Sequence, residues 1–201
     1  MKILLDNVES IINVNEYESF QVLLWDIEKT METRGRVITS LKVDGMNLEN
    51  TLNFSLEEIR ILEISSKSPL KLLEETIHEL DTYLDRFFLG IEEIVLNFRI
   101  GKREEGISNL IEGINGLDWI FQILRKSQEL LDIDNENLEK IYIESNDVLL
   151  RLTEAVEEKK YDAISIILDF DLYMILSQIK EFVPVIFELL KVNDGNDILF
   201  N

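Results

Sequence analysis

Cysteine is absent from this sequence, and histidine and proline are rare. Among 201 residues there is no cysteine, a single histidine, His78, and only two prolines, Pro69 and Pro184. Without cysteine the chain can form neither a disulfide framework nor a thiolate metal site, and it has no thiol nucleophile. With one histidine, on the polar side of a predicted helix, a serine-based catalytic triad has no suitable base.

Long apolar runs are absent as well. The amino terminus reaches an acid at Asp6 before any signal-like segment develops, and no later stretch approaches the length of a membrane span. There is also no Gly/Ser-rich linker or low-complexity tract, so any border between domains must be short. We therefore expect a cytoplasmic globular protein that does not bind a membrane.

Basic residues are scarce relative to acids. The chain has 20 Lys and Arg against 40 Asp and Glu, which gives a formal net charge of -20. This charge repels phosphate backbones and anionic lipid, so we expect no direct binding to nucleic acid. Most of the acids are interpreted as solvated helix faces, and the alternative is a docking surface for a basic partner.

The first third of the sequence alternates between strand-like and helical patterns. The turn-forming pairs Asp6-Asn7 and Asp44-Gly45 separate runs of β-forming residues. The predicted elements are strands over residues 2–5 and 10–14, a helix over residues 16–35, and strands over residues 37–43 and 59–64. A hairpin, a helix and further strands within residues 1–66 predict a β-grasp-like α/β domain, in which one sheet wraps over one helix.

Part of this region resembles a known family. Residues 37–43, the pair Asp44-Gly45, and then Leu48-Glu49 and Thr51-Leu52 are similar to the second half of ubiquitin-like domains. Ubiquitin-like modifiers end in a free Gly-Gly tail, whereas this region continues through residues 65–67 into a helix. The resemblance therefore implies a recognition surface and not conjugation chemistry.

The remaining sequence carries apolar stripes in alternating steps of three and four residues, the spacing of one helix face. Ser68-Pro69 marks the start of the first helix, with Ser as cap and Pro at the first helical position. The first three stripes consist of Leu70, Leu73, Ile77, Leu80, Leu84, Phe87, Ile91, Ile94 and Phe98, then Ile107, Leu110, Ile114, Leu117, Phe121, Leu124 and Leu131, then Leu138, Ile141, Val148, Leu152 and Ala155. A fourth helix is predicted over residues 161–191.

Short connections force consecutive long helices to run antiparallel, so we predict an up-down four-helix bundle. The predicted fold is α+β and mostly helical overall. Its parts are a β-grasp-like domain over residues 1–66, an acidic four-helix bundle over residues 67–192, and a short tail over residues 193–201. Gly106, Gly113 and Gly116 fall inside the second long helix, where we expect them to permit close contact with another helix.

Two short motifs have the spacing of metal sites, but each lacks residues that such a site needs. Glu75-x-x-His78 has the spacing used in di-iron bundles, but the second histidine that such sites need does not exist, and both residues point away from the apolar stripe. In Asp132-x-Asp134-x-Glu136, the positions that a calcium loop requires as Gly and Glu are occupied by other residues. We therefore predict no catalytic residue, no metal site and no cofactor.

The fourth predicted helix holds two features that simple packing does not explain. Asp171 lies in line with Ile164, Leu168 and Ile175, which predicts a partly buried acid that needs a basic or hydrogen-bonding partner. Pro184 should kink or break the helix. Together, Phe182, Val183, Pro184 and Ile186 form a candidate groove for a partner helix.

These observations favour a non-enzymatic interaction protein, of the adaptor or chaperone type, whose partner is another protein that is basic or helical. Recognition would use the surface near Pro184 or the face of the sheet. Two alternatives come from other classes. One is an acidic mimic of nucleic acid that binds a basic protein, and the other is a carboxylate-dependent metal enzyme.

Overall fold

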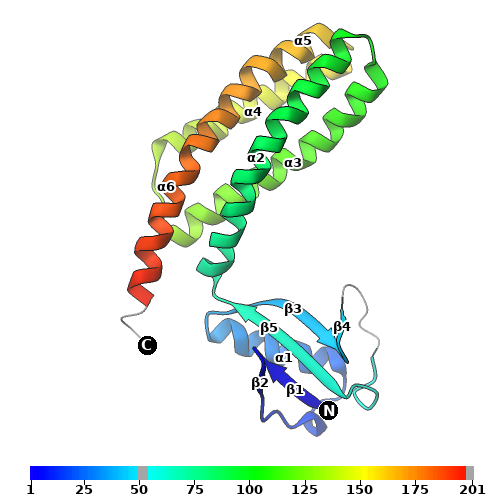
Figure 1. Cartoon of the computed structure of the whole chain (residues 1–201), viewed down its shortest axis with the longest axis vertical. Helices are drawn as coiled ribbons and strands as arrows, with labels where there is room; N and C mark the ends of the chain where they lie inside the picture. The colour runs from blue at the N-terminus through cyan, green and yellow to red at the C-terminus, as the bar shows by residue number, and fades with distance from the viewer. Residues whose placement is uncertain (49–53, 198–201) are drawn as a thin grey trace. The chain divides into compact units, whose positions relative to one another are not determined.

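The computed structural model describes residues 1–48 and 54–197. A mixed sheet with one helix is followed by four long packed helices, which confirms the predicted α+β fold that is mostly helical (Figure 1). The chain separates into two compact units, Met1–Leu72 (unit 1) and Leu73–Asn201 (unit 2). Of the residues on which the ubiquitin-like resemblance depends, Glu49, Thr51 and Leu52 lie outside the described part.

Unit 1 contains a five-stranded sheet in the order β2-β1-β5-β3-β4. The strands are β1 (Lys2–Leu5), β2 (Val8–Glu9), β3 (Val37–Val43), β4 (Met46–Asn47) and β5 (Ile61–Lys67). The central strands β1 and β5 pair in parallel, whereas every other pair in this sheet is antiparallel. Parallel neighbours need a crossover connection, and the segment that contains helix α1 (Phe20–Thr33) supplies it.

The strand predicted over residues 10–14 is wrong. Asp6 and Asn7 both have positive φ angles, 50° and 66°, so they form a two-residue turn, and Leu5 pairs directly with Val8. The returning strand β2 therefore starts before residue 10 and ends at Glu9. Residues Val14–Glu16 instead form the short 3-10 helix η1.

The core of unit 1 lies between α1 and the sheet. Helix α1 begins at Phe20 and not at residue 16, because the Ser19 hydroxyl accepts a hydrogen bond from the Val22 N–H (3.3 Å) and caps the helix there. The buried core consists of Ile3, Phe20, Leu23, Ile27, Met31, Val43, Ile59, Leu62 and Ile64. One sheet covering one helix is the arrangement that the sequence pattern predicts.

A polar cluster ties the first turn of the sheet to its last strand. The Asp6 carboxylate accepts hydrogen bonds from the Ser66 N–H (2.6 Å) and hydroxyl (2.8 Å), and Arg36 lies 3.1 Å from the same carboxylate. Burial raises the pKa of Asp6, but the hydrogen bonds from Ser66 and the charge of Arg36 outweigh burial, so the pKa is lowered overall. These contacts hold Asp6 ionised in the turn that starts β2.

Unit 2 is built from antiparallel long helices, which Figure 1 shows side by side. Their bounds are α2 (Pro69–Arg99), α3 (Arg103–Leu131), α4 (Glu136–Glu157) and the continuous run of α5 (Tyr161–Ile166), η2 (Ile167–Leu172) and α6 (Tyr173–Asp197). The predicted cap at the start of α2 is confirmed, because the Lys71 N–H donates to the Ser68 hydroxyl (3.2 Å). Between α3 and α4, Asn135 caps the new helix by accepting from the Asn137 N–H (2.8 Å).

The turn between α2 and α3 and the turn between α4 and α5 have the same backbone geometry. Gly101 and Lys159 both adopt positive φ, 82° and 56°. The residues that follow them, Lys102 and Lys160, have nearly equal backbone angles, with φ near -80° and -85° and ψ near 65° and 72°. These tight connections reverse the chain within a few residues and make the helices antiparallel.

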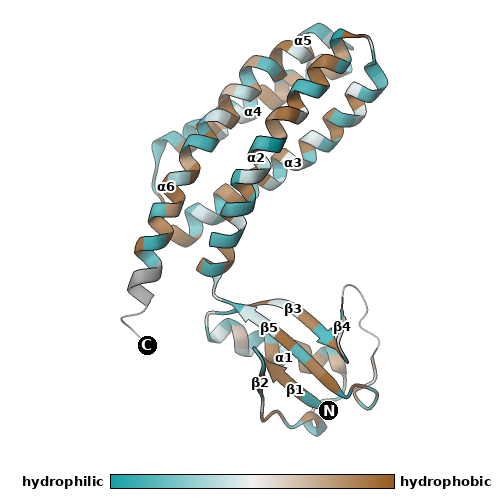
Figure 2. Cartoon of the chain, in the orientation of Figure 1, coloured by the Kyte–Doolittle hydropathy of each residue, from teal (hydrophilic) through white to brown (hydrophobic). Residues whose placement is uncertain are grey.

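The apolar stripes largely form the core of the bundle (Figure 2). Leu80, Leu117 and Leu152, one from each of the first three predicted stripes, are each at most 2% exposed, so these stripes face the core as predicted. In α4 every predicted stripe residue is buried, and Ser145 donates to the Ile141 carbonyl (2.6 Å), which satisfies its hydroxyl. In α3 the prediction for Ile114 is wrong: it is 43% exposed, and Ile120 and Ile123 lie in the core instead.

The fourth helix is not regular. Residues Ile167–Leu172 form the π-helical segment η2, which has more residues per turn than an α-helix. Ile164 of α5 and Leu168 and Leu172 of η2 are buried, and each is four residues from the next. A wider turn keeps residues at this spacing on one face. Beyond η2, α6 continues to Asp197, so the helix is longer than the 161–191 predicted and does not break at Pro184.

Among residues 1–48 and 54–197, no helix is both long and apolar enough to cross a bilayer.

Candidate functional site

The apolar groove predicted near Pro184 is not on the surface. Phe182, Val183 and Ile186 are 8%, 1% and 0% exposed, because they face the core of the bundle. Pro184 is exposed on the opposite side of α6. It is the one exposed member of the predicted set.

Asp171 is partly buried in the structure, with its side chain 37% exposed. The neighbouring Leu172, in the π-helical segment, occupies the core position. Asp171 has a basic partner: Arg151 of α4 donates to its carboxylate at 2.9 Å. This hydrogen bond raises the pKa of Arg151 above its ordinary value. On the other side of η2, Arg99 and Asp169 form a matching ion pair at 2.8 Å.

The residues considered for metal binding do not converge. His78 is exposed, as its position off the stripe predicts, and its ring contacts Phe187 of α6 at a centroid distance of 4.5 Å. Asp132 and Asn135 end one helix and cap the next. Within the described residues, no three His, Asp or Glu side chains are grouped so that they could hold a metal ion.

A groove lies instead between α2 and α3. Its first part, about 700 Å³ in volume, is lined by Glu79 and Tyr83 of α2 and by Glu112 and Trp119 of α3, with others. A second part, about 410 Å³, continues the groove past Gly90. The two parts share Tyr83, Arg86 and Glu112. From residue 78 to residue 94, the α2 side of the two parts covers about 24 Å of helix.

Glycines create the floor of this groove. A side-chain carbon on Gly113 would have its nearest neighbours, on Ile94 and Phe87, at 3.8 and 3.9 Å, which is ordinary van der Waals contact and leaves room for a methyl group. At Gly116 the same carbon would overlap the Tyr83 hydroxyl and lie 2.8 Å from the Phe87 ring. Gly116 therefore lets the aromatic side chains of α2 lie against α3, as the close helix contact predicted for these glycines requires.

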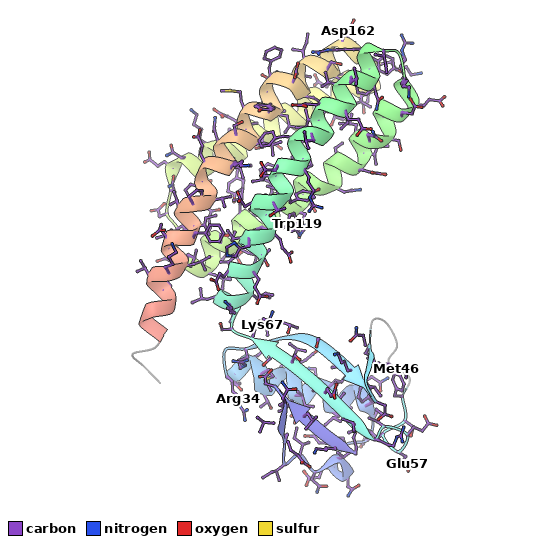
Figure 3. The ribbon with its side chains drawn as sticks, in the orientation of Figure 1. Arg34, Met46, Glu57, Lys67, Trp119 and Asp162 are labelled. Atoms are coloured by element: carbon purple, nitrogen blue, oxygen red, sulfur yellow. The ribbon has the colours of Figure 1, made fainter. Side chains whose placement is uncertain are left out.

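Aromatic side chains from both α2 and α3 line the groove and form what we call the aromatic wall, and Figure 3 labels one of them, Trp119. Tyr83 and Trp119 meet edge to face at 4.9 Å, and Tyr83 also contacts Phe87 at 5.8 Å. Both Tyr83 and Trp119 are partly exposed. Trp25, the second tryptophan, belongs to unit 1 and is 60% exposed there. Partly exposed aromatic side chains in a hollow are typical anchors for a protein partner.

The rim of the groove is mainly acidic. Glu79 and Glu112 stand on opposite walls, are exposed, and form no ion pair with any residue in the described part of the chain. Glu93 accepts a weak hydrogen bond from Asn109 across the second part of the groove (3.5 Å). Arg86 is the basic residue in both linings.

Comparison with known proteins identifies the family to which this chain belongs. The model of the family described as domain of unknown function (DUF8042) matches residues 75–182, which is more than half of the chain. The chain belongs to the DUF8042 family. The DUF8042 region starts in α2 and ends in α6, so it contains the whole groove and leaves out the sheet. No curated protein and no solved structure matches the chain.

Sequence reasoning missed the groove, although part of its signal is visible. Gly113, Gly116 and Trp119 are spaced three apart on one face of the predicted helix. That spacing indicates a shallow face with an aromatic edge, but it does not say which helix lies opposite. Tyr83 and Arg86 of α2, which complete the groove, carry no such signal.

Proposed function

We propose that this DUF8042 protein is a non-enzymatic interaction protein and that the α2–α3 groove binds a segment of another protein. The observation that carries the proposal is an open groove with a glycine floor and a partly exposed Tyr83–Trp119 pair. An edge-to-face aromatic pair costs little conformational entropy on binding, because each ring has only two rotatable bonds. It therefore suits recognition better than flexible side chains would.

The shape favours a helical segment as the ligand. A groove of about 24 Å accepts about four turns of a partner helix, whose side chains repeat every three to four residues. The ridge of such a helix can rest over Gly90, where a side-chain carbon would have no neighbour within 4 Å. Gly90 belongs to the second part of the groove, next to the aromatic pair.

Unit 1 has a separate role in the proposal. We propose that it is a ubiquitin-like β-grasp domain that acts as a recognition module and not as a modifier. The sheet over a single helix and the central parallel pair β1–β5 support this proposal. A cytoplasmic location and a basic partner stay predictions from the sequence.

Filling the groove tests the function. Gly113→Trp should occupy the hollow, whereas Gly113→Ala adds one methyl group in ordinary contact and is the matched control. Full-length protein carrying each change is used to capture partners from the source cell after crosslinking. We expect the wild type and Gly113→Ala to capture the same proteins and Gly113→Trp to lose them. The same set with all three variants contradicts a binding role for the groove.

A further inference from the structure

One cationic side chain of the protein itself, that of Arg86, already lies in the groove. The guanidinium carbon of Arg86 lies 5.7 Å from the centroid of the Tyr83 ring, within the range of a cation–π contact. Arg86 comes from the same helix as Tyr83 and is exposed. Its contact shows that the aromatic wall is accessible to a guanidinium group from the solvent side.

The carboxylates around this wall have no such partner. Glu79 and Glu112 reach the groove from α2 and α3, and neither forms an ion pair within the described residues. Some other glutamates of the bundle do form ion pairs, for example Glu129 with Lys126 (2.6 Å) and Glu188 with Lys191 (2.7 Å). Two unpaired carboxylates beside an aromatic pair favour a cationic group from another molecule.

We propose that the groove recognises an arginine side chain presented by a basic, amphipathic helix of the partner. The arginine lies against the Trp119–Tyr83 wall and donates to Glu79 and Glu112, while apolar side chains of the same helix rest over Gly113. Arg86 competes with this arginine, because it occupies the Tyr83 ring in the free protein. This inference rests on the proposed function and names its partner class.

Arginine fits this site better than lysine. A planar guanidinium stacks on an aromatic ring and offers several N–H donors in one plane, so it can reach carboxylates on both walls. An ammonium group is a compact, strongly hydrated charge that does not stack. The net charge of -20 assists the approach of any basic helix, so the specific test must separate local contacts from this general attraction.

The experiment uses the full chain with Trp25→Phe, so that Trp119 is the single tryptophan and is excited selectively over the tyrosines. The probes are two designed amphipathic helical peptides without tryptophan, identical except that one carries arginine and the other citrulline, its neutral analogue, at the central position of the polar–apolar boundary. We expect the arginine peptide to change Trp119 fluorescence and to bind about tenfold more tightly than the citrulline peptide. Equal affinity for both peptides overturns the inference.

Three variants locate the contact. Glu112→Gln should weaken binding of the arginine peptide about fivefold, and Arg86→Gln should strengthen it about twofold, because it frees the Tyr83 ring. Glu104→Gln is the control: it removes the same charge from an exposed position of the same helix, outside the groove. A loss with Glu104→Gln equal to that with Glu112→Gln, or weaker binding with Arg86→Gln, overturns the inference.

The experiment distinguishes an error about arginine recognition from an error about the groove as a binding site. If Gly113→Trp blocks both peptides and the wild type binds them equally, the groove is a binding site but arginine recognition is wrong. If Gly113→Trp leaves both affinities unchanged, the groove is not the binding site, and both proposals fall. Circular dichroism of each variant confirms that the bundle is intact before binding is compared.

Discussion

Two glycines of α3 differ sharply in what a methyl group would meet. At Gly106 the added carbon would lie 2.7 to 3.0 Å from three ring carbons of Phe98, and that ring is itself only 7% exposed. At Gly113 the nearest atoms are in ordinary van der Waals contact. The same residue type therefore serves close packing at one position and leaves a hollow at the other.

We predict opposite effects of alanine at these two positions. Gly113→Ala should stabilise the protein by up to about 1 kcal/mol, because alanine loses less backbone entropy in a helix. Gly106→Ala should destabilise it by about 1 to 2 kcal/mol, because the Phe98 ring must shift within a packed core. Thermal unfolding measures both, with about 1 kcal/mol corresponding to about 3 to 5 °C.

The pair of variants provides its own control, since both make the same chemical change in the same helix. Equal shifts of the melting temperature would mean that helix propensity dominates and that the contact between Gly106 and Phe98 is loose. A loss of stability at Gly113 would mean that the groove is narrower than the distances to Ile94 and Phe87 indicate.

At the scale of elements, the segment η2 decides which side chains of the fourth helix face the core. A π-helical segment corresponds to an α-helix with an inserted residue. The insertion gives Leu172 the core position that an ideal α-helix would give to Asp171. Phe170 is 62% exposed within it, so its removal costs little burial.

We predict that deletion of Phe170 is tolerated. The shortened segment can become a regular α-helix, and the residues after it keep their core positions because the extra residue has been removed. The melting temperature should change by less than about 5 °C. Deletion of Glu181, an exposed residue in the regular part of α6, is the control. It rotates all later core residues by about 100° and should unfold the bundle.

Circular dichroism and thermal unfolding of the two deletion variants distinguish these cases. Loss of helical structure in both variants would show that η2 is needed for the bundle itself. Survival of both would show that the end of α6 after Glu181 contributes little to the core, although Val183 and Ile186 are buried there.

For the whole molecule, the balance of charge is the dominant electrostatic property. A formal net charge of -20 opposes compaction through self-repulsion. The ion pairs that could offset it are largely exposed, such as Lys29–Glu32 and Arg151–Asp147, and pairs of this kind contribute at most about 1 kcal/mol each. Repulsion should therefore outweigh attraction at low ionic strength.

We predict that added salt stabilises this protein. Raising NaCl from about 0.01 M to about 0.15 M shortens the screening length from about 30 Å to about 8 Å and weakens the repulsion between acidic helix faces. The melting temperature should rise by several degrees, and KCl at the same concentration should have the same effect. A fall in melting temperature would show that the surface ion pairs dominate instead.

Much of the fold could be predicted because the sequence patterns are local. The stripe of α4, from Leu138 to Ala155, is buried at every predicted position, and the turn pair Asp44-Gly45 forms where the sequence indicates it. The predictions failed where packing against a neighbouring helix decides which side chains are buried. Ile114 has the right spacing to be a core residue, but the bundle buries Ile120 and Ile123 instead.

The candidate site was predicted less well than the fold. Phe182, Val183 and Ile186 were correctly recognised as apolar, but their spacing is equally compatible with a core and with a groove, and the structure assigns them to the core. The groove joins Tyr83 and Arg86 of α2 to Gly113 and Trp119 of α3. Such a combination depends on which helices are neighbours, and that information is not contained in either helix alone.

The sequence by itself determined the long helices, most of their apolar faces, the excess of acidic residues and the absence of cysteine, because each follows from residue type and spacing along the chain. Tertiary structure alone decided that α2 and α3 enclose an open groove, that Asp171 meets Arg151, and that Pro184 lies outside the core. The physical reason is that all the long helices carry the same three-four spacing. Which face meets which is set by the packing of complete helices against one another.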